Sequence, residues 1–488
     1  MVKAESPRGR LYLWLLAALG VYAAAFLTYS QTAAYAYDES YHLLAAQLIS
    51  TGRTPYLDFC FPQTPLNAYW NAGWMYILGQ SWRVAHFLAA LWTMGAVVLT
   101  AEFVYRRFPV AGWRVGAAAT AGLGTGLNAL VFQYGPLAQA YGLCLFALVA
   151  AFRCTIRAVD GKGPLLAGCA GLFAGAAAGS SLLSAAGAPV VLGWMLYYNR
   201  AGSRWTKLIG FGVGMAIPFA PVFRLFALGP AQTLFNVIQY HALYRKLYWP
   251  HTTRHDLETL TAWIDSGQGL VLGLLAAFGL IFIVRRAAWT RELKAEFYLC
   301  AWLAAGLGAE VGRAHPTFPQ YFLLTIPFLA ILAVAGIYAL ASRVLEVDRS
   351  RWPMALVSAL FVLGLGKSLY EDRTSNNWGM FQRLADKIEQ VTPRDARVFA
   401  DEPIYFLTKR TPPSGLELHY SHKVHLPAGE AAMLHILTED EVKGLVQTGK
   451  FATAYTCEDD EITEYGLKEL YGQSVKMEDC TIFWDRKK

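Results

Sequence analysis

The sequence predicts a polytopic α-helical membrane protein that ends in a small α/β domain. The chain of 488 residues is 55% hydrophobic and only 16% charged, and apolar runs near the length of a membrane span recur as far as residue 370. Beyond that point the runs stop and the charge changes sign. Residues 1–370 carry 27 Lys+Arg against 14 Asp+Glu, whereas 371–488 carry 15 against 21. A single soluble domain does not fit this composition.

We expect about eleven transmembrane helices, near residues 11–30, 84–105, 113–132, 136–152, 164–181, 182–198, 207–226, 269–285, 296–311, 321–341 and 353–370. The first run, LYLWLLAALGVYAAAFLTYS, is too long for a signal-peptide core and lacks a small-residue cleavage site, so we expect a retained helix. The alternative to the pair across SSLLSAAGAPV is one long helix plus a re-entrant piece, which would move the tail to the cytoplasm.

The distribution of cations predicts the topology. The N-terminus and the short segments on its side hold 19 Lys+Arg, far more than the longer segments on the other side. We therefore expect a cytoplasmic N-terminus, and an odd number of spans then places the tail outside. Cations in short clusters between apolar runs indicate topology rather than nucleic-acid binding. No nucleic-acid motif is found.

Two domains are predicted: residues 1–370, which span the membrane and include a first outer loop at 31–83, and the extracytoplasmic domain 371–488. In the second, FQRLADKIEQV indicates an amphipathic helix, ARVFADEPIYFL a strand, and TEDEVKGLVQTG a helix closed by Gly. A tail of 118 residues is large enough for its own core.

The seven cysteines fall into different settings. Several lie in or beside predicted spans, where a small apolar residue is the ordinary explanation. These are Cys144, Cys154, Cys169 and Cys300. Cys457 and Cys480 lie in the tail, where an oxidising compartment would allow a disulfide between them. Free thiols in the purified protein would exclude that bond.

The stretch AYAYDESYHLL places Asp38 and Glu39 directly after the first span. Locally, Asp38 is explained as a helix N-cap and Glu39 as a first-turn residue, both favourable at the positive end of a helix. A carboxylate held rigidly and partly desolvated at that position also suits a general base or an acceptor for a substrate hydroxyl. The two interpretations are compatible.

Longer motifs follow in the same loop and later in the chain. The loop continues STGRTPYLDFCFPQTPLNAYW, with a Gly-x-x-Pro-Tyr-x-Asp turn and a Pro-x-x-Pro step. With GRAHPTFPQYFLLTIPFLAIL and the tail segment DARVFADEPIYFLTKRTPPSG, this resembles the GT-C glycosyltransferases, especially protein O-mannosyltransferases and bacterial aminoarabinose transferases. The resemblance covers most of the chain but rests on few specific residues. It implies transfer of a hexosyl or pentosyl group from a polyprenyl-phosphate donor to a hydroxyl acceptor at the outer face of a bacterial inner membrane, with the C-terminal domain in the periplasm.

The resemblance also implies roles for acidic residues of the first loop. Asp38 matches the acidic residue taken as general base or acceptor-orienting group, with Glu39 as its catalytic neighbour. Asp58 falls on the second acidic position of the loop, a substrate-binding one. Where some relatives have a Glu-Lys pair, this chain has Gln63 and Thr64. That departure leaves the sugar and the acceptor open.

Further substrate-binding residues are implied near the donor phosphate. Arg313 and His315 fall where relatives place such groups, and Tyr321 where they place an aromatic residue. Arginine suits phosphate because its fork binds two oxygens and stays charged. Alternatives to Arg313 in the loop at 227–268 are Arg245, Lys246 and Arg254.

Each of these residues also has an ordinary explanation. Arg313 would anchor a span among headgroups, and Tyr321 would belong to an aromatic belt. His315 would be structural at a helix boundary, and Asp58 would cap a turn.

No certain cofactor is predicted. No His/Cys cluster has ligand spacing, and an Asp-Glu pair does not specify a metal, so a divalent cation between Asp38 and a phosphate stays open. The implied partners are a polyprenyl-phosphate sugar donor, membrane lipid, and a lipid, protein or polysaccharide acceptor. A transporter or flippase of lipid-linked sugars is one rival, for which we find neither inverted repeats nor charges in broken helices. The other is a non-catalytic envelope-polysaccharide assembly protein.

Overall fold

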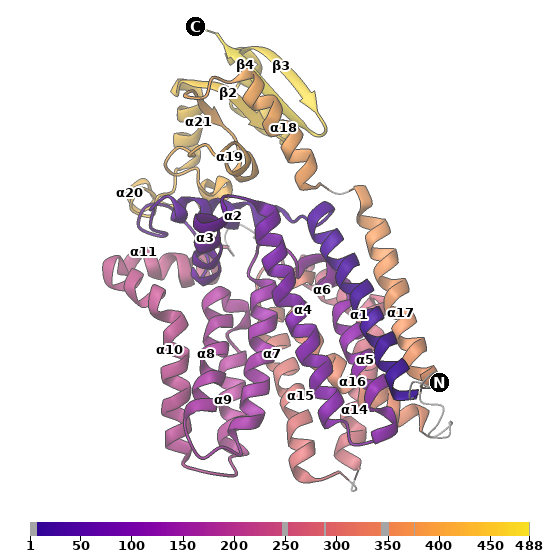
Figure 1. The fold of residues 1–488 in the computed structure, drawn as a ribbon. Helices are drawn as coiled ribbons and strands as arrows, with labels where there is room; N and C mark the ends of the chain where they lie inside the picture. Colours follow the sequence, from indigo (N-terminus) through magenta and orange to yellow (C-terminus); the bar gives the residue numbers. More distant parts are fainter. Residues whose placement is uncertain (1–6, 246–251, 287–288, 343–350, 375, 488) are drawn as a thin grey trace. The chain divides into compact units, whose positions relative to one another are not determined.

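The computed structural model describes residues 7–487 apart from 246–251, 287–288, 343–350 and 375, and most of them are helical (Figure 1). The chain divides into two compact units. The helical unit contains Met1–Ala34, Arg83–Phe219 and Thr253–Ser375, and the mixed unit contains Tyr35–Trp82, Ala220–Thr252 and Asn376–Lys488. Each unit is thus assembled from segments that lie far apart in the sequence.

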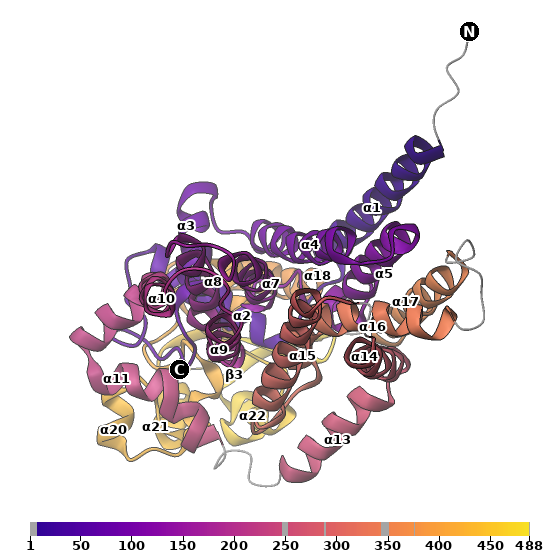
Figure 2. The same ribbon diagram turned by 90° about the horizontal axis from the view of Figure 1, so that it is seen from below.

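The helical unit is built mainly from long apolar helices, several of which are seen end-on in Figure 2. The helices of this unit are α1 (Pro7–Thr32), α4 (Trp82–Arg107), α5 (Arg114–Gly126), α6 (Ala129–Tyr134), α7 (Tyr141–Ala158), α8 (Leu165–Ser180), α9 (Gly187–Tyr197), α10 (Arg204–Leu228), α13 (Thr252–Asp265), α14 (Gly267–Arg285), α15 (Arg291–Gly312), α16 (Ile326–Ala341) and α17 (Arg351–Glu371). Short 3-10 turns accompany them: η1 (Ala111–Trp113), η2 (Leu182–Ser184), η4 (Pro319–Thr325) and η6 (Asp372–Thr374).

Six helices in the described part of the chain are long and apolar enough to cross a membrane. They are Trp82–Arg107, Tyr141–Ala158, Arg204–Leu228, Gly267–Arg285, Pro319–Ala341 and Trp352–Glu371. The prediction of a polytopic helical membrane protein is therefore confirmed. The count of eleven spans and the orientation of the two termini stay predictions.

The chain interrupts its apolar runs at two places in the helical unit. A single helix over 113–132 is wrong, because Asn128 adopts an extended backbone and its side chain accepts a hydrogen bond from the amide of Leu130 (3.1 Å), which starts α6 anew. Across SSLLSAAGAPV the chain breaks as expected. Ser181 is extended, and η2 separates α8 from α9.

Glycines allow neighbouring helices of this unit to approach closely. A Cβ at Gly279 of α14 would lie 2.0 Å from the carbonyl oxygen of Leu332, and one at Gly336 of α16 would lie 2.0 Å from that of Leu275. Small residues let helix backbones pack closely where lipid supplies no hydrophobic driving force. The glycine-rich composition therefore has a structural use in this pair.

The mixed unit combines loop segments with the C-terminal chain. Its helices are α2 (Tyr37–Ser50), α3 (Leu66–Leu78), α11 (Pro230–Leu234), the π-helical η3 (Phe235–Tyr244), α18 (Trp378–Val391), α19 (Glu402–Thr408), η7 (His419–Val424), α20 (Ala428–Met433), α21 (Glu439–Thr448), α22 (Asp459–Glu464) and α23 (Leu467–Leu470). Its strands are β1 (Arg397–Phe399), β2 (Phe451–Thr456), β3 (Tyr471–Met477) and β4 (Cys480–Arg486).

The four strands form one sheet in the order β1-β2-β4-β3. β1 pairs with β2 in parallel, and β4 pairs antiparallel with both β2 and β3. Buried apolar residues of β2 and α21, such as Phe451, Ala454, Val442 and Val446, share one core.

The two helices expected in the tail, at FQRLADKIEQV and TEDEVKGLVQTG, are both present. FQRLADKIEQV lies in α18, and α21 carries a capping box between Thr438 and Glu441 and ends at Gly449. The strand expected over ARVFADEPIYFL is only partly right. It stops at Phe399, and Pro403 near the first helical position turns the rest into α19.

Cys457 and Cys480 form a disulfide, as hypothesised. It ties the end of β2 to the start of β4. The four cysteines of the helical unit are free: Cys144 and Cys300 are buried, whereas Cys154 and Cys169 are partly buried.

Candidate active site

Asp38 and Glu39 occupy the first turn of α2. The helix begins at Tyr37 and its N-cap is Ala36, so the expected N-cap role of Asp38 is wrong by two positions. Both carboxylates still lie at the positive end of the helix, which favours negative charge. The side chain of Asp38 is therefore not used to cap the helix.

Asp38 lies in an environment that suits a proton acceptor. The residue is exposed, and the protein atoms packed around its carboxyl still remove part of its hydration. This burial raises the pKa of its carboxyl above the ordinary value, and the positive charge of Arg245 opposes the rise. An accessible, partly desolvated carboxylate within range of a guanidinium charge suits a substrate hydroxyl that lies next to a phosphate.

Arg245 is brought to this position by contacts between two loop segments. It follows η3, whose buried Asn236 accepts a hydrogen bond from the amide of Phe61 (2.8 Å). His241 Nε2 lies 2.6 Å from the carbonyl oxygen of Pro62. The sequence analysis did not single out Asn236 or His241, because neither belongs to a local pattern.

Glu39 has a structural partner. Its side chain is fully buried, and its Oε2 accepts a hydrogen bond from the indole of Trp378 (3.0 Å). Trp378 in turn stacks on Trp82, with ring centroids 5.6 Å apart. Glu39 thus joins α2 to α18, and its expected catalytic role stays a prediction.

Asp58 closes a turn of the first loop. Its Oδ2 accepts a hydrogen bond from the amide of Thr54 (2.6 Å), and its own amide donates to the carbonyl of Thr54 (2.9 Å). The carboxylate is exposed. The neighbouring Arg53 pairs with buried Glu417 at 2.8 Å, which ties the turn to the tail. The geometry matches the turn-cap explanation, and a substrate contact remains untested.

A second Asp-Glu pair, missed by the sequence analysis, lies in the same unit. Asp401 and Glu402 are buried, and burial raises both pKa values, that of Asp401 to about 8. The charge of Asp38 adds to the rise at Glu402. The signal was present as the repeated Asp-Glu in FADEPIY, but only tertiary packing places it near the first pair.

The buried pair is part of a longer polar chain. Glu402 Oε1 accepts a hydrogen bond from the amide of His419 (2.7 Å), and His419 Nε2 lies 2.9 Å from Glu461 Oε1. Burial lowers the pKa of His419, but the hydrogen bond and charge of Glu461 outweigh it, and the pKa rises to about 9. His419 is therefore a buried cation among carboxylates.

The remaining predicted residues lie in the helical unit. Arg313 is exposed at the C-terminal end of α15, where the helix dipole favours a cation. His315 Nδ1 lies 2.5 Å from Asp256 Oδ2, and the amide of Thr317 donates to Asp256 Oδ1 (2.8 Å). Asp256 thus fixes the turn that carries His315. The two residues are 59 positions apart, so no local sequence pattern could predict their contact.

Tyr321 is buried in η4 and packs edge-on against Phe318 at 5.6 Å. Arg254 is exposed on α13 and pairs with Glu258 at 2.7 Å. Lys246 lies outside the described residues. Two groups of predicted residues result: Asp38, Glu39, Asp58 and Arg245 in the mixed unit, and Arg313, His315 and Tyr321 in the helical unit.

Within the part of the chain that the structure describes, no three His, Cys, Asp or Glu side chains are grouped to hold one metal ion.

Similarity to solved structures is found along nearly the whole chain. ArnT from Cupriavidus metallidurans matches with a TM-score of 0.68 in the apo state and 0.67 bound to undecaprenyl phosphate. In both cases identity is 14% and the match covers 98% of each chain. An oligosaccharyltransferase from Archaeoglobus fulgidus has a TM-score of 0.50 at 12% identity, over 91% of this chain and 68% of that one. Both proteins are GT-C superfamily members.

This chain has the GT-C fold. No family model matches it, and no curated protein sequence does. At 14% identity the likeness establishes the GT-C fold, and site residues have to be argued from this chain's own geometry.

Proposed function

We propose that this GT-C chain is a membrane glycosyltransferase that moves a sugar from a polyprenyl-phosphate donor to a hydroxyl acceptor at the outer face of a bacterial inner membrane. The observation that carries the proposal is the exposed carboxylate of Asp38 on the first turn of α2, on which the positive charge of Arg245 acts. The GT-C fold supports it, and so does the undecaprenyl phosphate held by one of the similar structures.

In the proposed reaction the acceptor oxygen attacks the anomeric carbon of the donor sugar. Asp38 takes the hydroxyl proton, the bond between that carbon and the phosphate oxygen breaks, and the lipid phosphate leaves with the electron pair. Arg245 stabilises the departing phosphate through charge-assisted hydrogen bonds. Direct displacement inverts the anomeric centre. Arg313 and His315 are the second set of candidates for the phosphate, and Tyr321 for the sugar or lipid.

The proposal is tested by transfer of a radiolabelled sugar from a panel of polyprenyl-phosphate sugars in membranes that contain the full chain. Asp38→Asn is expected to lower the rate about 10²- to 10⁴-fold, as for loss of a general base. Asp395→Asn is the matched control, because it removes an exposed carboxylate of the same unit. Full activity of a folded Asp38→Asn protein would refute the assignment.

Arg245→Gln gives an independent test through the pH profile. Arg245 opposes the rise in the pKa of Asp38, so its removal raises that pKa further. Transfer requires ionised Asp38, and the acidic limb of the rate profile is therefore expected to move to higher pH. An unchanged acidic limb would mean that Arg245 does not influence the ionisation of Asp38.

Two outcomes would redirect the proposal. Loss of transfer in EDTA with recovery on adding Mg²⁺ would add a divalent cation between Asp38 and the donor phosphate. No transfer from any donor by intact wild-type protein would leave transport of lipid-linked sugars, or a non-catalytic assembly role, to be assayed next.

A further inference from the structure

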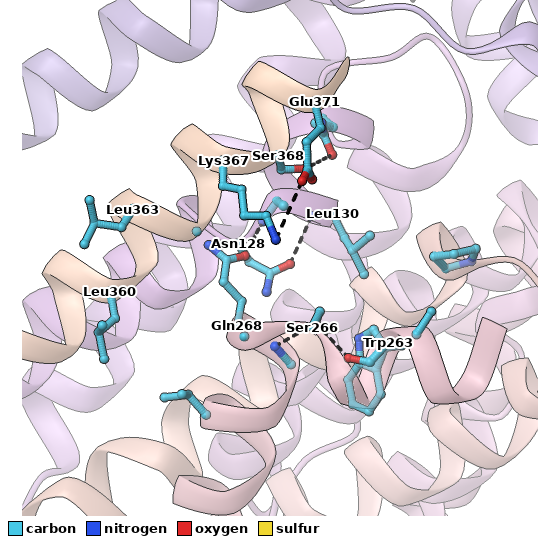
Figure 3. Close-up of a pocket in the computed structure, with 18 residues that line it drawn as sticks. Asn128, Leu130, Trp263, Ser266, Gln268, Leu360, Leu363, Lys367, Ser368 and Glu371 are labelled. Atoms are coloured by element: carbon cyan, nitrogen blue, oxygen red, sulfur yellow. Dashed lines mark hydrogen bonds and ion pairs between the residues drawn. The ribbon is translucent and has the colours of Figure 1, made fainter. Parts of the chain in front are cut away.

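A cavity of about 580 Å³ lies in the helical unit where α14 begins and α17 ends (Figure 3). Residues of α6, α13 and η4 complete its lining. Its volume falls within the range of ordinary ligand sites. No residue of the proposed reaction lines it.

The two ends of the cavity differ in chemistry. Figure 3 shows Lys367, Ser368 and Glu371 together on the last turns of α17, whereas Leu360 and Leu363 lie farther back on the same helix. Both leucines are exposed, by 43% and 68%. Because α14 and α17 are long and apolar enough to span a membrane, these exposed leucines face lipid chains. The polar end then lies at the membrane surface, where the span stops.

The floor of the cavity is held rigidly. Gln268 donates to the carbonyls of Leu127 (3.0 Å) and Phe361 (2.8 Å), and its Oε1 accepts from the amide of Ala129 (2.8 Å). A Cβ at Gly364 would lie 2.7 Å from Gln268 Cγ, so glycine is what lets α17 approach this amide. The hollow is thus a fixed feature of the packing.

Lys367 and Glu371, the charged residues at the polar end, form only a weak ion pair. Lys367 Nζ and Glu371 Oε1 are 3.6 Å apart, and the side chains are 77% and 61% exposed. Exposed pairs of this kind contribute little to stability. Each group therefore keeps hydrogen-bonding capacity for a ligand that carries both an anion and a cation.

We propose that this cavity binds a zwitterionic glycerophospholipid with a primary ammonium in its headgroup. The phosphate lies at Lys367, the ammonium at Glu371, and an acyl chain follows Leu360 and Leu363. A polyprenyl phosphate matches this end less well, because it offers only negative charge and Glu371 repels it. The site is thus distinct in its ligand from the proposed donor site.

The experiment is native mass spectrometry of the full-length protein in detergent, titrated with phosphatidylethanolamine, phosphatidylcholine or phosphatidylglycerol of the same acyl chains. Wild type is expected to bind phosphatidylethanolamine about tenfold more tightly than phosphatidylglycerol, as one additional charge-assisted hydrogen bond provides. Glu371→Gln should abolish this preference, and Lys367→Gln should weaken binding of all three lipids. Glu292→Gln, which removes an exposed carboxylate at the start of α15, should change nothing.

Equal affinity of wild type for the three lipids, or an unchanged preference in Glu371→Gln, would overturn the inference. Tighter binding of phosphatidylglycerol, or of undecaprenyl phosphate added as a competitor, would assign the cavity to an anionic lipid instead. The altered side chains are largely exposed, so the variants are expected to melt near the wild-type temperature. Binding is the readout, so the result does not depend on the proposed transfer reaction.

Discussion

Replacing Glu461 by glutamine should remove the pH dependence that the buried His419 gives to the mixed unit. The two side chains are each 7% exposed, and Glu461 Oε1 lies 2.9 Å from His419 Nε2. Glu461 Oε2 also accepts a hydrogen bond from Thr456 (2.5 Å). The Glu461→Gln variant would keep the shape of the site but lose the charge that holds His419 protonated.

The magnitude follows from the shift in pKa. The pKa of His419 rises from 6.5 to about 9 in the folded protein, which corresponds to about 3 kcal/mol of stability. Because the folded pKa is the higher one, this stability is fully present below pH 6.5 and is lost as pH rises through 9. Asp401 acts in the same direction. Its pKa rises from 3.8 to about 8, so its contribution is lost between those values.

The assay is thermal unfolding of the full chain in detergent at pH 6 and pH 9.5. At about 2–4 °C per kcal/mol, Glu461→Gln should lower Tm by about 10 °C at pH 6 and by much less at pH 9.5, where His419 is neutral in both proteins. Glu458→Gln is the control, since it removes a nearby carboxylate that is 43% exposed. An equal decrease in Tm at both pH values, or a wild-type Tm that rises with pH, would refute the reasoning.

Three further predictions concern contacts that tie the mixed unit together. Cys480→Ser should lower the free energy of unfolding by about 3 kcal/mol, since the bond to Cys457 closes a loop with a sequence separation of 23. Denaturation with and without reductant measures this loss, and free thiols in unreduced protein would contradict the prediction. Trp378→Phe should lower the free energy of unfolding, measured by thermal unfolding, by about 2 kcal/mol, because buried Glu39 loses the hydrogen bond from the indole. An unchanged stability would mean that another donor replaces the indole. Asn236→Ala should lower the free energy of unfolding by about 1–3 kcal/mol, and it should raise KM for the lipid donor because Arg245 is displaced. A lower Tm with an unchanged KM would limit Asn236 to a structural role.

Local patterns in the sequence determined much of the architecture. Apolar runs near the length of a span predicted the six long apolar helices, because a helix in lipid has to satisfy its backbone internally and cover its surface with apolar side chains. The helix α21 was equally readable, since a capping box and a closing glycine act within one or two turns. For the disulfide, the sequence showed only that two cysteines were available in the tail. Whether they meet depends on how β2 and β4 pair.

Some local patterns misled because a short-range competitor was stronger. The run at 113–132 is apolar throughout, yet the side chain of Asn128 starts a new helix inside it. In ARVFADEPIYFL the β-favouring residues are real, but Pro403 and the acidic pair before it favour a helix start after three strand residues. In both cases one polar or cyclic residue outweighed the hydrophobic pattern.

The sequence alone determined that Asp38 lies at the start of a helix, and it made this carboxylate a candidate site residue. Only the tertiary structure brought the charge of Arg245 within range of Asp38, with η3 held by Asn236, which lies 175 residues from its partner Phe61. The same holds for the burial of Asp401, whose raised pKa depends on neighbours from several segments. Hydrophobic period and capping act between residues a few positions apart, whereas desolvation and charge act through space, so they are fixed only when distant segments pack together.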